Sequence, residues 1–213
     1  MKKLILLSTL FMSAITSFSQ SAKYAPAMQT NIAALDSAFR NPANLLALAN
    51  NFERIAAAEK NQWLAYYYAA YCQVNYGYFE KDKTKTDGYA DKATALINIA
   101  DSLAPNNSEI SCIRSMIGTC HMMVNPMQRY MQYGEEVNSN MEKAMEQDPS
   151  NPRPYLLKGQ GLRYTPEQFG GGCATAKPEL QKALEKFAAF KPATDLHPNW
   201  GKSRTEQLLS ECK

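Results

Sequence analysis

One sequence pattern, an amphipathic segment that stops at a proline, recurs three times in this chain and constrains its fold more than any other feature. In residues 93–105, 137–149 and 180–192, apolar or small side chains stand at positions i, i+4 and i+7, and a proline follows five residues later. This spacing predicts one face of an α-helix followed by a stop. The face residues are Ala93, Ile97 and Ala100; Val137, Met141 and Ala144; Leu180, Leu184 and Phe187. Because the prolines recur about every 44 residues, the pattern predicts stacked units.

Each unit is expected to contain helix A, a connector, helix B and a proline turn. The third helix A carries Tyr155, Gly159 and Leu162 at large, small and large positions, and the second helix B is the segment 137–149. These residues resemble the tetratricopeptide repeat. That resemblance implies an all-α, right-handed solenoid of about three helix-pair repeats, at 62–105, 106–149 and 150–192.

The units are longer than the usual tetratricopeptide unit of about 34 residues. We assign the extra residues to the connectors between helices A and B, at Asn75–Asp87, Val124–Tyr133 and Arg163–Lys177. Apolar periodicity also predicts flanking helices outside the repeats. They are expected at Ala27–Phe39, Asn44–Lys60 and Ser203–Cys212.

The first 20 residues have the pattern of an export signal. Lys2 and Lys3 precede the apolar stretch Leu4–Ile15, which is too short to span a bilayer, and Ser17–Gln20 is polar. No cysteine follows the stretch to carry a lipid. We therefore expect residues 1–20 to be a cleaved signal peptide and residues 21–213 to be one periplasmic or secreted domain without membrane insertion.

Charge and motifs exclude several classes of function. The net charge of +3 falls to +1 when the two lysines of the signal are removed, so no basic footprint for nucleic acid remains. Metalloprotease, serine hydrolase and phosphate-loop motifs are missing from the sequence. Only His121 and His197 are available as neutral-pH proton shuttles, and neither has a recognisable catalytic context. We predict a protein that is not an enzyme and needs no cofactor.

Five cysteines in an exported chain suggest disulfide bonding. Cys112 and Cys120 are about 12 Å apart on one helix, too far to pair. We predict a bridge between Cys173 and Cys212, with Cys72, Cys112 and Cys120 buried as thiols. A copper(I) site built from Cys112, Met116, Cys120, Met123 and Met127 is the alternative, since sulfur ligands select that ion.

Candidate binding residues lie on the helices expected to face inward. An aromatic run begins at Trp63, and we assign Trp63 and Tyr67 to the core but Tyr68 and Tyr71 to a concave groove. In the third unit the inward positions include Arg153, Gln160 and Arg163, where two arginines can hold a carboxylate.

The segment Thr165–Cys173 holds three consecutive glycines after Phe169. Gly170, Gly171 and Gly172 either form a ligand loop or make a tight reversal with Phe169 in an apolar slot. The loop is similar to one in periplasmic tetratricopeptide subunits of TRAP-type transporters. Two functions therefore stay open: a binding or scaffold module with a protein or peptide partner on its concave surface, or a small-solute carrier with a pocket near this loop.

Overall fold

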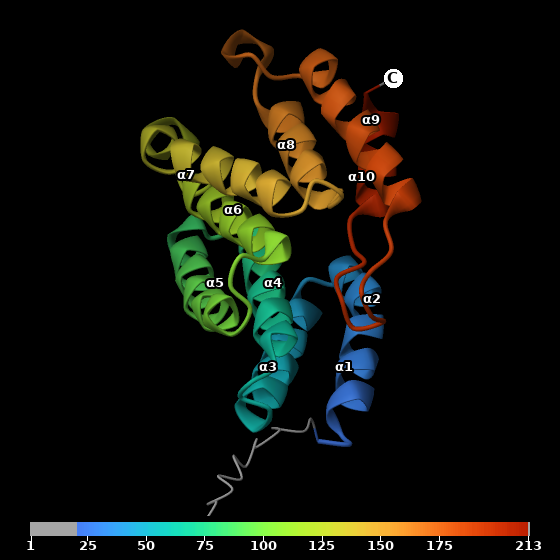
Figure 1. Ribbon diagram of the computed structural model, residues 1–213. Coiled ribbons are helices and arrows are strands. Elements are labelled where there is room, and N and C mark those ends of the chain that lie inside the picture. Colours follow the sequence, from blue (N-terminus) through green and yellow to red (C-terminus); the bar gives the residue numbers. More distant parts are fainter. Residues whose placement is uncertain (1–20, 213) are drawn as a thin grey trace, which may run out of the picture.

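The computed structural model describes residues 21–212 and is all-helical over that range (Figure 1). The expected signal peptide, residues 1–20, lies outside the described residues. The helices are α1 (Tyr24–Ala33), α2 (Leu35–Arg40), α3 (Ala43–Ala58), α4 (Trp63–Phe79), α5 (Lys83–Leu103), α6 (Ser108–Met122), α7 (Pro126–Gln147), α8 (Arg153–Tyr164), the 3-10 turn η1 (Glu167–Phe169), α9 (Cys173–Ala189) and α10 (Lys202–Glu211). Within residues 21–212, no helix is both long enough and apolar enough to cross a membrane.

Successive helices pack against each other as pairs. The main pairs are α3 with α4, α4 with α5, α6 with α7 and α8 with α9, and α4 also contacts α6, which contacts α8. Side-chain caps set where these helices begin: Asp82, Asn107 and Asn125 each accept a hydrogen bond from a backbone N–H in the first turn of α5, α6 and α7.

The extra residues of the first two units are helical, so the prediction that they form long connectors was wrong. Only three residues separate α4 from α5 and three separate α6 from α7. Tyr76 and Tyr78 continue the packed face of α4, and Asn125 with Pro126 starts a new helix at once. Only the third unit has a non-helical insertion, from Thr165 to Gly172 around η1.

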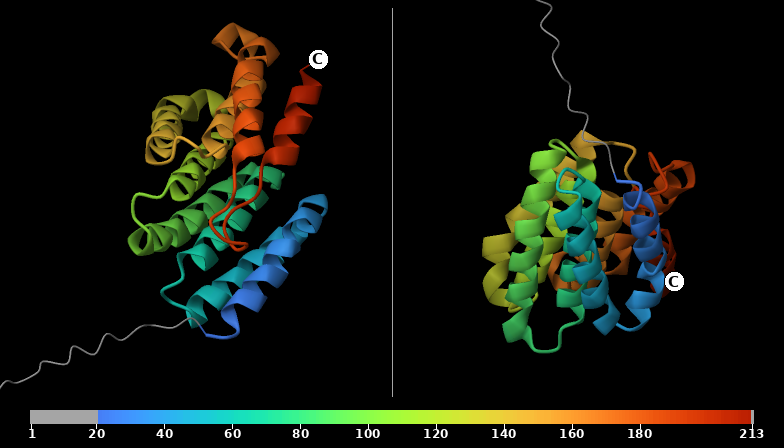
Figure 2. Two further views of the ribbon diagram at one scale, coloured as in Figure 1. Left: turned by 45° about the vertical axis from the view of Figure 1, so that its right-hand side comes forward. Right: turned by 90° about the horizontal axis from the view of Figure 1, so that it is seen from below.

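The buried side chains form two clusters. The larger cluster joins residues of α1 to α6, and the smaller one joins α8, α9 and α10. Trp200 packs against both. It lies in residues 190–201, which we call the strap, the segment that leaves α9, extends towards α1 and α2 and returns into α10 (Figure 2).

Candidate functional site

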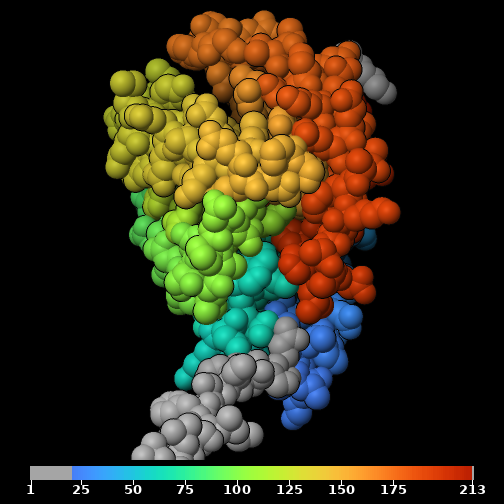
Figure 3. Space-filling model, viewed as in Figure 1, coloured from blue at the N-terminus to red at the C-terminus, as the bar shows by residue number. Residues whose placement is uncertain are grey.

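A pocket of about 900 Å³ lies where the strap faces the first residues of three helices. It is lined by Trp63 at the start of α4, residues 105–109 at the start of α6, residues 147–151 before α8, and α9 and strap residues between 182 and 198. These green, amber and red-orange segments meet on the face shown in Figure 3. The volume is within the range of sites for small organic ligands.

A buried ion pair lies beneath this pocket. The Arg153 side chain is fully buried and its Nη1 is 2.8 Å from Glu109 Oε1. Glu109 also accepts hydrogen bonds from Tyr67 Oη at 3.2 Å and Asn151 Nδ2 at 2.8 Å. Burial raises the pKa of Glu109, and the positive charge of Arg153 opposes that rise. The pair fixes the starts of α6 and α8 relative to each other.

Arg153 also holds the strap in place. Its Nη2 donates to Pro198 O, and its guanidinium lies 4.8 Å from the Phe190 ring centroid and 5.1 Å from that of Trp200. From α4, Tyr68 Oη donates to Leu196 O at 3.0 Å. The strap is therefore bound at both ends and in its middle.

His197 lies directly between two of these anchors, Leu196 and Pro198. Its ring centroid lies 5.7 Å from that of Trp63 in an edge contact, and both residues line the pocket. His197 Nδ1 lies 2.8 Å from Thr194 Oγ1. Partial burial lowers the pKa of His197 below its ordinary value, so the ring is neutral at neutral pH.

The rim of the pocket carries both signs of charge. Three lysines line it, together with three carboxylates: Lys182, Lys186 and Lys191; Glu109, Asp148 and Glu185. The starts of α4 and α6 also border the pocket, and helix N-termini carry partial positive charge. The lysines and these helix starts are the groups on the rim that can bind a carboxylate.

The structure brings three of the predicted site residues together, but beneath the strap. Tyr68 and Tyr71 are 1% and 4% exposed, and Arg153 is 0% exposed. Phe52 stacks on Tyr68, and Trp200 stacks on Tyr71 with centroids 4.9 Å apart. The prediction that Tyr68 and Tyr71 line an open groove is contradicted, because the strap covers them. Tyr67 is buried as expected, whereas Trp63 is only partly buried and borders the pocket.

Gln160 and Arg163 lie elsewhere, on the later turns of α8. Gln160 Oε1 accepts a hydrogen bond from Arg204 Nε at 3.1 Å, and Arg163 lies 5.9 Å from the ring centroid of Tyr164. Neither lines the pocket beside the strap. The structure therefore does not join them to Tyr68, Tyr71 and Arg153 in one site.

The glycine-rich segment forms a tight reversal between α8 and α9. Gly170 and Gly172 have φ values of +83° and +91°, and a Cβ on Gly171 would lie 2.1 Å from Thr165 O. The Gly172 N–H donates to Leu162 O at 2.9 Å. Phe169 is 60% exposed rather than held in a slot. The turn geometry alone therefore requires these glycines.

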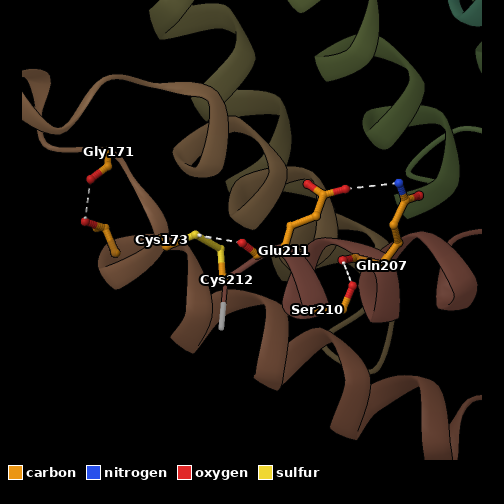
Figure 4. Close-up of a disulfide and its surroundings, with 7 residues drawn as sticks. Gly171, Cys173, Gln207, Ser210, Glu211 and Cys212 are labelled. Atoms are coloured by element: carbon orange, nitrogen blue, oxygen red, sulfur yellow. Dashed lines mark hydrogen bonds between the residues drawn. A yellow bond between two sulfur atoms is a disulfide. The ribbon is translucent and has the colours of Figure 1, made fainter.

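The predicted disulfide between Cys173 and Cys212 is present and joins the start of α9 to the end of α10 (Figure 4). Cys72, Cys112 and Cys120 are buried free thiols, as expected. Burial raises the pKa of Cys120 to about 12, so the side chain is a neutral thiol in this structure. Met127 is 77% exposed on α7, beyond the end of α6, and no cluster of metal-ligating His, Cys, Asp and Glu occurs within residues 21–212.

The pocket includes residues that the sequence did not indicate as a site. Trp63 was assigned to the core, and His197 had no recognisable context. A local signal existed only in the composition of the strap, whose prolines and Trp200 interrupt the helical pattern between α9 and α10.

Comparison with known proteins gives one informative relationship. No protein-family model and no curated protein sequence matches the chain. Among solved structures, the HusA haemophore from Porphyromonas gingivalis is 38% identical, with a TM-score of 0.80. The match covers 92% of this chain and 95% of that one. Identity and coverage of this extent mean that the chain belongs to the family of the HusA haemophore.

Proposed function

We propose that this protein is an exported, non-enzymatic carrier that binds haem or a related porphyrin in the pocket beside the strap. The relationship to a haemophore supports the ligand class. The pocket itself carries the proposal, because it combines partly buried aromatic residues with three lysines on its rim. The disulfide supports an oxidising, extracytoplasmic location.

The chemistry of the lining matches the two parts of a porphyrin. Its flat apolar macrocycle needs rings and other apolar surface, which Trp63, Phe190 and Pro198 supply. Its propionate carboxylates need cations or helix N-termini, which the three lysines and the start of α6 supply.

Porphyrin titration tests this function. Purified protein is titrated with haem and with metal-free protoporphyrin while tryptophan fluorescence and porphyrin absorbance are followed. Trp63→Ala is expected to weaken binding of both by about tenfold or more, since it removes a central aromatic contact. The matched control is Tyr130→Ala on α7, where the ring is 59% exposed and outside the pocket. Absence of saturable binding by the unchanged protein would exclude the function.

The repeat prediction leads to a further proposal about architecture. The contacts of α4 with α6 and of α6 with α8 support tetratricopeptide-like stacking, in which these three are the A helices of a right-handed solenoid. On that arrangement, the strap covers part of the inner face formed by α4. A long peptide laid across Tyr68 and Tyr71 would have to displace it.

A protein partner remains a second proposal. The exposed apolar side chains of α7, Met127, Tyr130 and Met131, are 77%, 59% and 88% exposed and favour such contact more than the strap-covered face does. The porphyrin proposal keeps the small-solute ligand class expected from the sequence. It moves the binding site from the glycine-rich loop to the pocket beside the strap. Size-exclusion chromatography with candidate partners tests this second proposal. Met127→Ser/Tyr130→Ser/Met131→Ser should lose a complex that the unchanged protein forms, whereas Trp63→Ala in the pocket should keep it.

A further inference from the structure

We infer that the buried ring of Tyr155 positions Lys182 and Lys186 at the rim of the pocket, where their two ammonium groups bind a carboxylate of the ligand. This inference rests on the proposed function and adds to it the residues that recognise a porphyrin propionate. Both lysines line the pocket, whereas Tyr155 does not. Tyr155 is therefore a positioning residue that acts through the lysines.

The two lysines lie about one turn apart on α9 and contact the same ring. Lys182 Nζ is 4.7 Å and Lys186 Nζ is 4.8 Å from the Tyr155 ring centroid. An ammonium group at such a distance is attracted to the electron-rich face of an aromatic ring. Like charges four residues apart on a helix repel each other. The ring offsets this repulsion and keeps both ammonium groups beside it.

The support for this lysine pair is rigid. Tyr155 is 8% exposed on α8 and belongs to the smaller buried cluster. Lys186 has a second attachment, because its Nζ donates to Pro149 O at 2.6 Å. These contacts restrict long side chains that would otherwise be flexible, so less conformational entropy is lost when they bind a ligand. Lys191, the third lysine of the rim, makes no such ring contact within residues 21–212.

The charges of the lysine pair are available to a ligand. Among residues 21–212, neither lysine forms an ion pair with a carboxylate. Of the carboxylates on the rim, Glu109 is paired with Arg153, and Asp148 accepts hydrogen bonds from Ser150. Glu185 is exposed on α9. On that side of the rim, two ammonium groups therefore outnumber one carboxylate.

The experiment compares two metal-free ligands that differ in the charge of their propionates. Protoporphyrin and its dimethyl ester are titrated into each protein, and tryptophan fluorescence is followed. We expect Lys182→Gln/Lys186→Gln to bind protoporphyrin about tenfold more weakly and the ester within about twofold of the unchanged protein. The matched control, Lys177→Gln/Lys202→Gln, removes two exposed lysines outside the pocket and should leave both affinities within about twofold.

The role of Tyr155 is tested by keeping or removing its ring. Tyr155→Phe keeps the ring and should bind both ligands as the unchanged protein does. Tyr155→Leu keeps an apolar side chain in the core but removes the ring, so it should bind protoporphyrin about threefold to tenfold more weakly. Its affinity for the ester should stay within about twofold, whereas a general packing defect would weaken both ligands. Circular dichroism establishes that each variant is folded before titration.

Three results would overturn the inference, and they differ in what else they affect. If Lys182→Gln/Lys186→Gln keeps its affinity for protoporphyrin, the lysine pair does not bind the carboxylate, although porphyrin carriage stands. If Tyr155→Leu binds protoporphyrin normally, or loses both ligands equally, Tyr155 does not position the pair. If the unchanged protein binds neither ligand, the inference and the proposed function fail together.

Discussion

Trp200 donates its indole N–H to the hydroxyl of Tyr67 at 2.8 Å, although the two residues are 133 positions apart in the chain. The Tyr67 hydroxyl in turn donates to Glu109, the partner of the buried Arg153. A single polar chain therefore connects the strap to α4, α6 and α8. Its members are buried or partly buried, where an unpaired group is expensive.

Removing the hydroxyl of Tyr67 tests this chain without changing its shape. Tyr67→Phe leaves the Trp200 N–H and one Glu109 oxygen short of a partner, so we expect a loss of about 1–3 kcal/mol in the free energy of unfolding. Urea denaturation followed by circular dichroism measures it. Tyr130→Phe, on an exposed ring, is the control and should change stability by less than about 0.5 kcal/mol. Equal values for the two variants would contradict the network.

Breaking the buried ion pair should cost more. Glu109→Gln removes the countercharge of a fully buried arginine, and we expect a loss of about 3–5 kcal/mol in the free energy of unfolding. The control is Glu179→Gln, which removes the partner of Lys158 in a partly exposed pair and should cost at most about 1 kcal/mol. A small effect at Glu109 would show that Arg153 does not depend on it.

The disulfide should stabilise the protein by restricting a long loop. Its cysteines are 39 residues apart, and the double variant Cys173→Ser/Cys212→Ser should lose about 2–4 kcal/mol. Thermal denaturation of both proteins measures the difference. Independently, a thiol assay on the denatured, unreduced protein should find three free thiols per chain, corresponding to Cys72, Cys112 and Cys120. Five thiols would exclude the bridge.

Two glycine variants distinguish a turn from a ligand loop. Gly171→Ala places a Cβ 2.1 Å from Thr165 O and should destabilise the fold by about 1–3 kcal/mol. Gly161→Ala, within α8, meets no atom within 4 Å and should instead stabilise it by about 0.5–1 kcal/mol. Both variants should bind haem like the unchanged protein once folded. Loss of haem binding in a folded Gly171→Ala protein would show that the haem site includes this loop and not only the pocket beside the strap.

Acid should destabilise the protein through His197. Because partial burial lowers the pKa of His197, the unfolded chain takes up this proton at higher pH than the folded chain does. The free energy of unfolding should therefore fall as the pH falls from about 6.5 through the folded pKa, and this residue should cause no change above that range.

This pH dependence is measured by urea denaturation at several pH values. His197→Gln, which carries no titrating ring, should lose less stability than the unchanged protein as the pH falls below about 6.5. Equal losses in the two proteins would exclude a contribution from His197.

The sequence predicted the local structure better than the site. Apolar spacing and proline stops predicted the positions of α5, α7 and α9, because the apolar face of a helix depends on residues that are close in sequence. The lengths of α4 and α7 were missed, since Tyr76, Tyr78 and Pro126 are equally compatible with a connector until their packing is known. The Cys173 to Cys212 bridge followed from its position at two chain segments that needed joining.

The pocket depends on contacts that no local pattern contains. Tyr68 and Tyr71 have the composition of a binding surface, yet they are covered by residues more than 100 positions away. His197 acquires its setting from Trp63 and Thr194, and Arg153 acquires its role from Glu109 and Pro198. Sequence spacing cannot reveal such pairs, because only the tertiary fold brings them together.

The strap also determines the order in which the protein can be completed. Its partners Tyr67, Tyr68 and Tyr71 belong to α4, which emerges early during synthesis, whereas the strap emerges almost last. Until then these aromatic rings lack their cover and stay open to solvent or to chaperones. Packing of the strap is therefore a late step of folding, and a chain cut before residue 190 would expose the apolar face around these tyrosines.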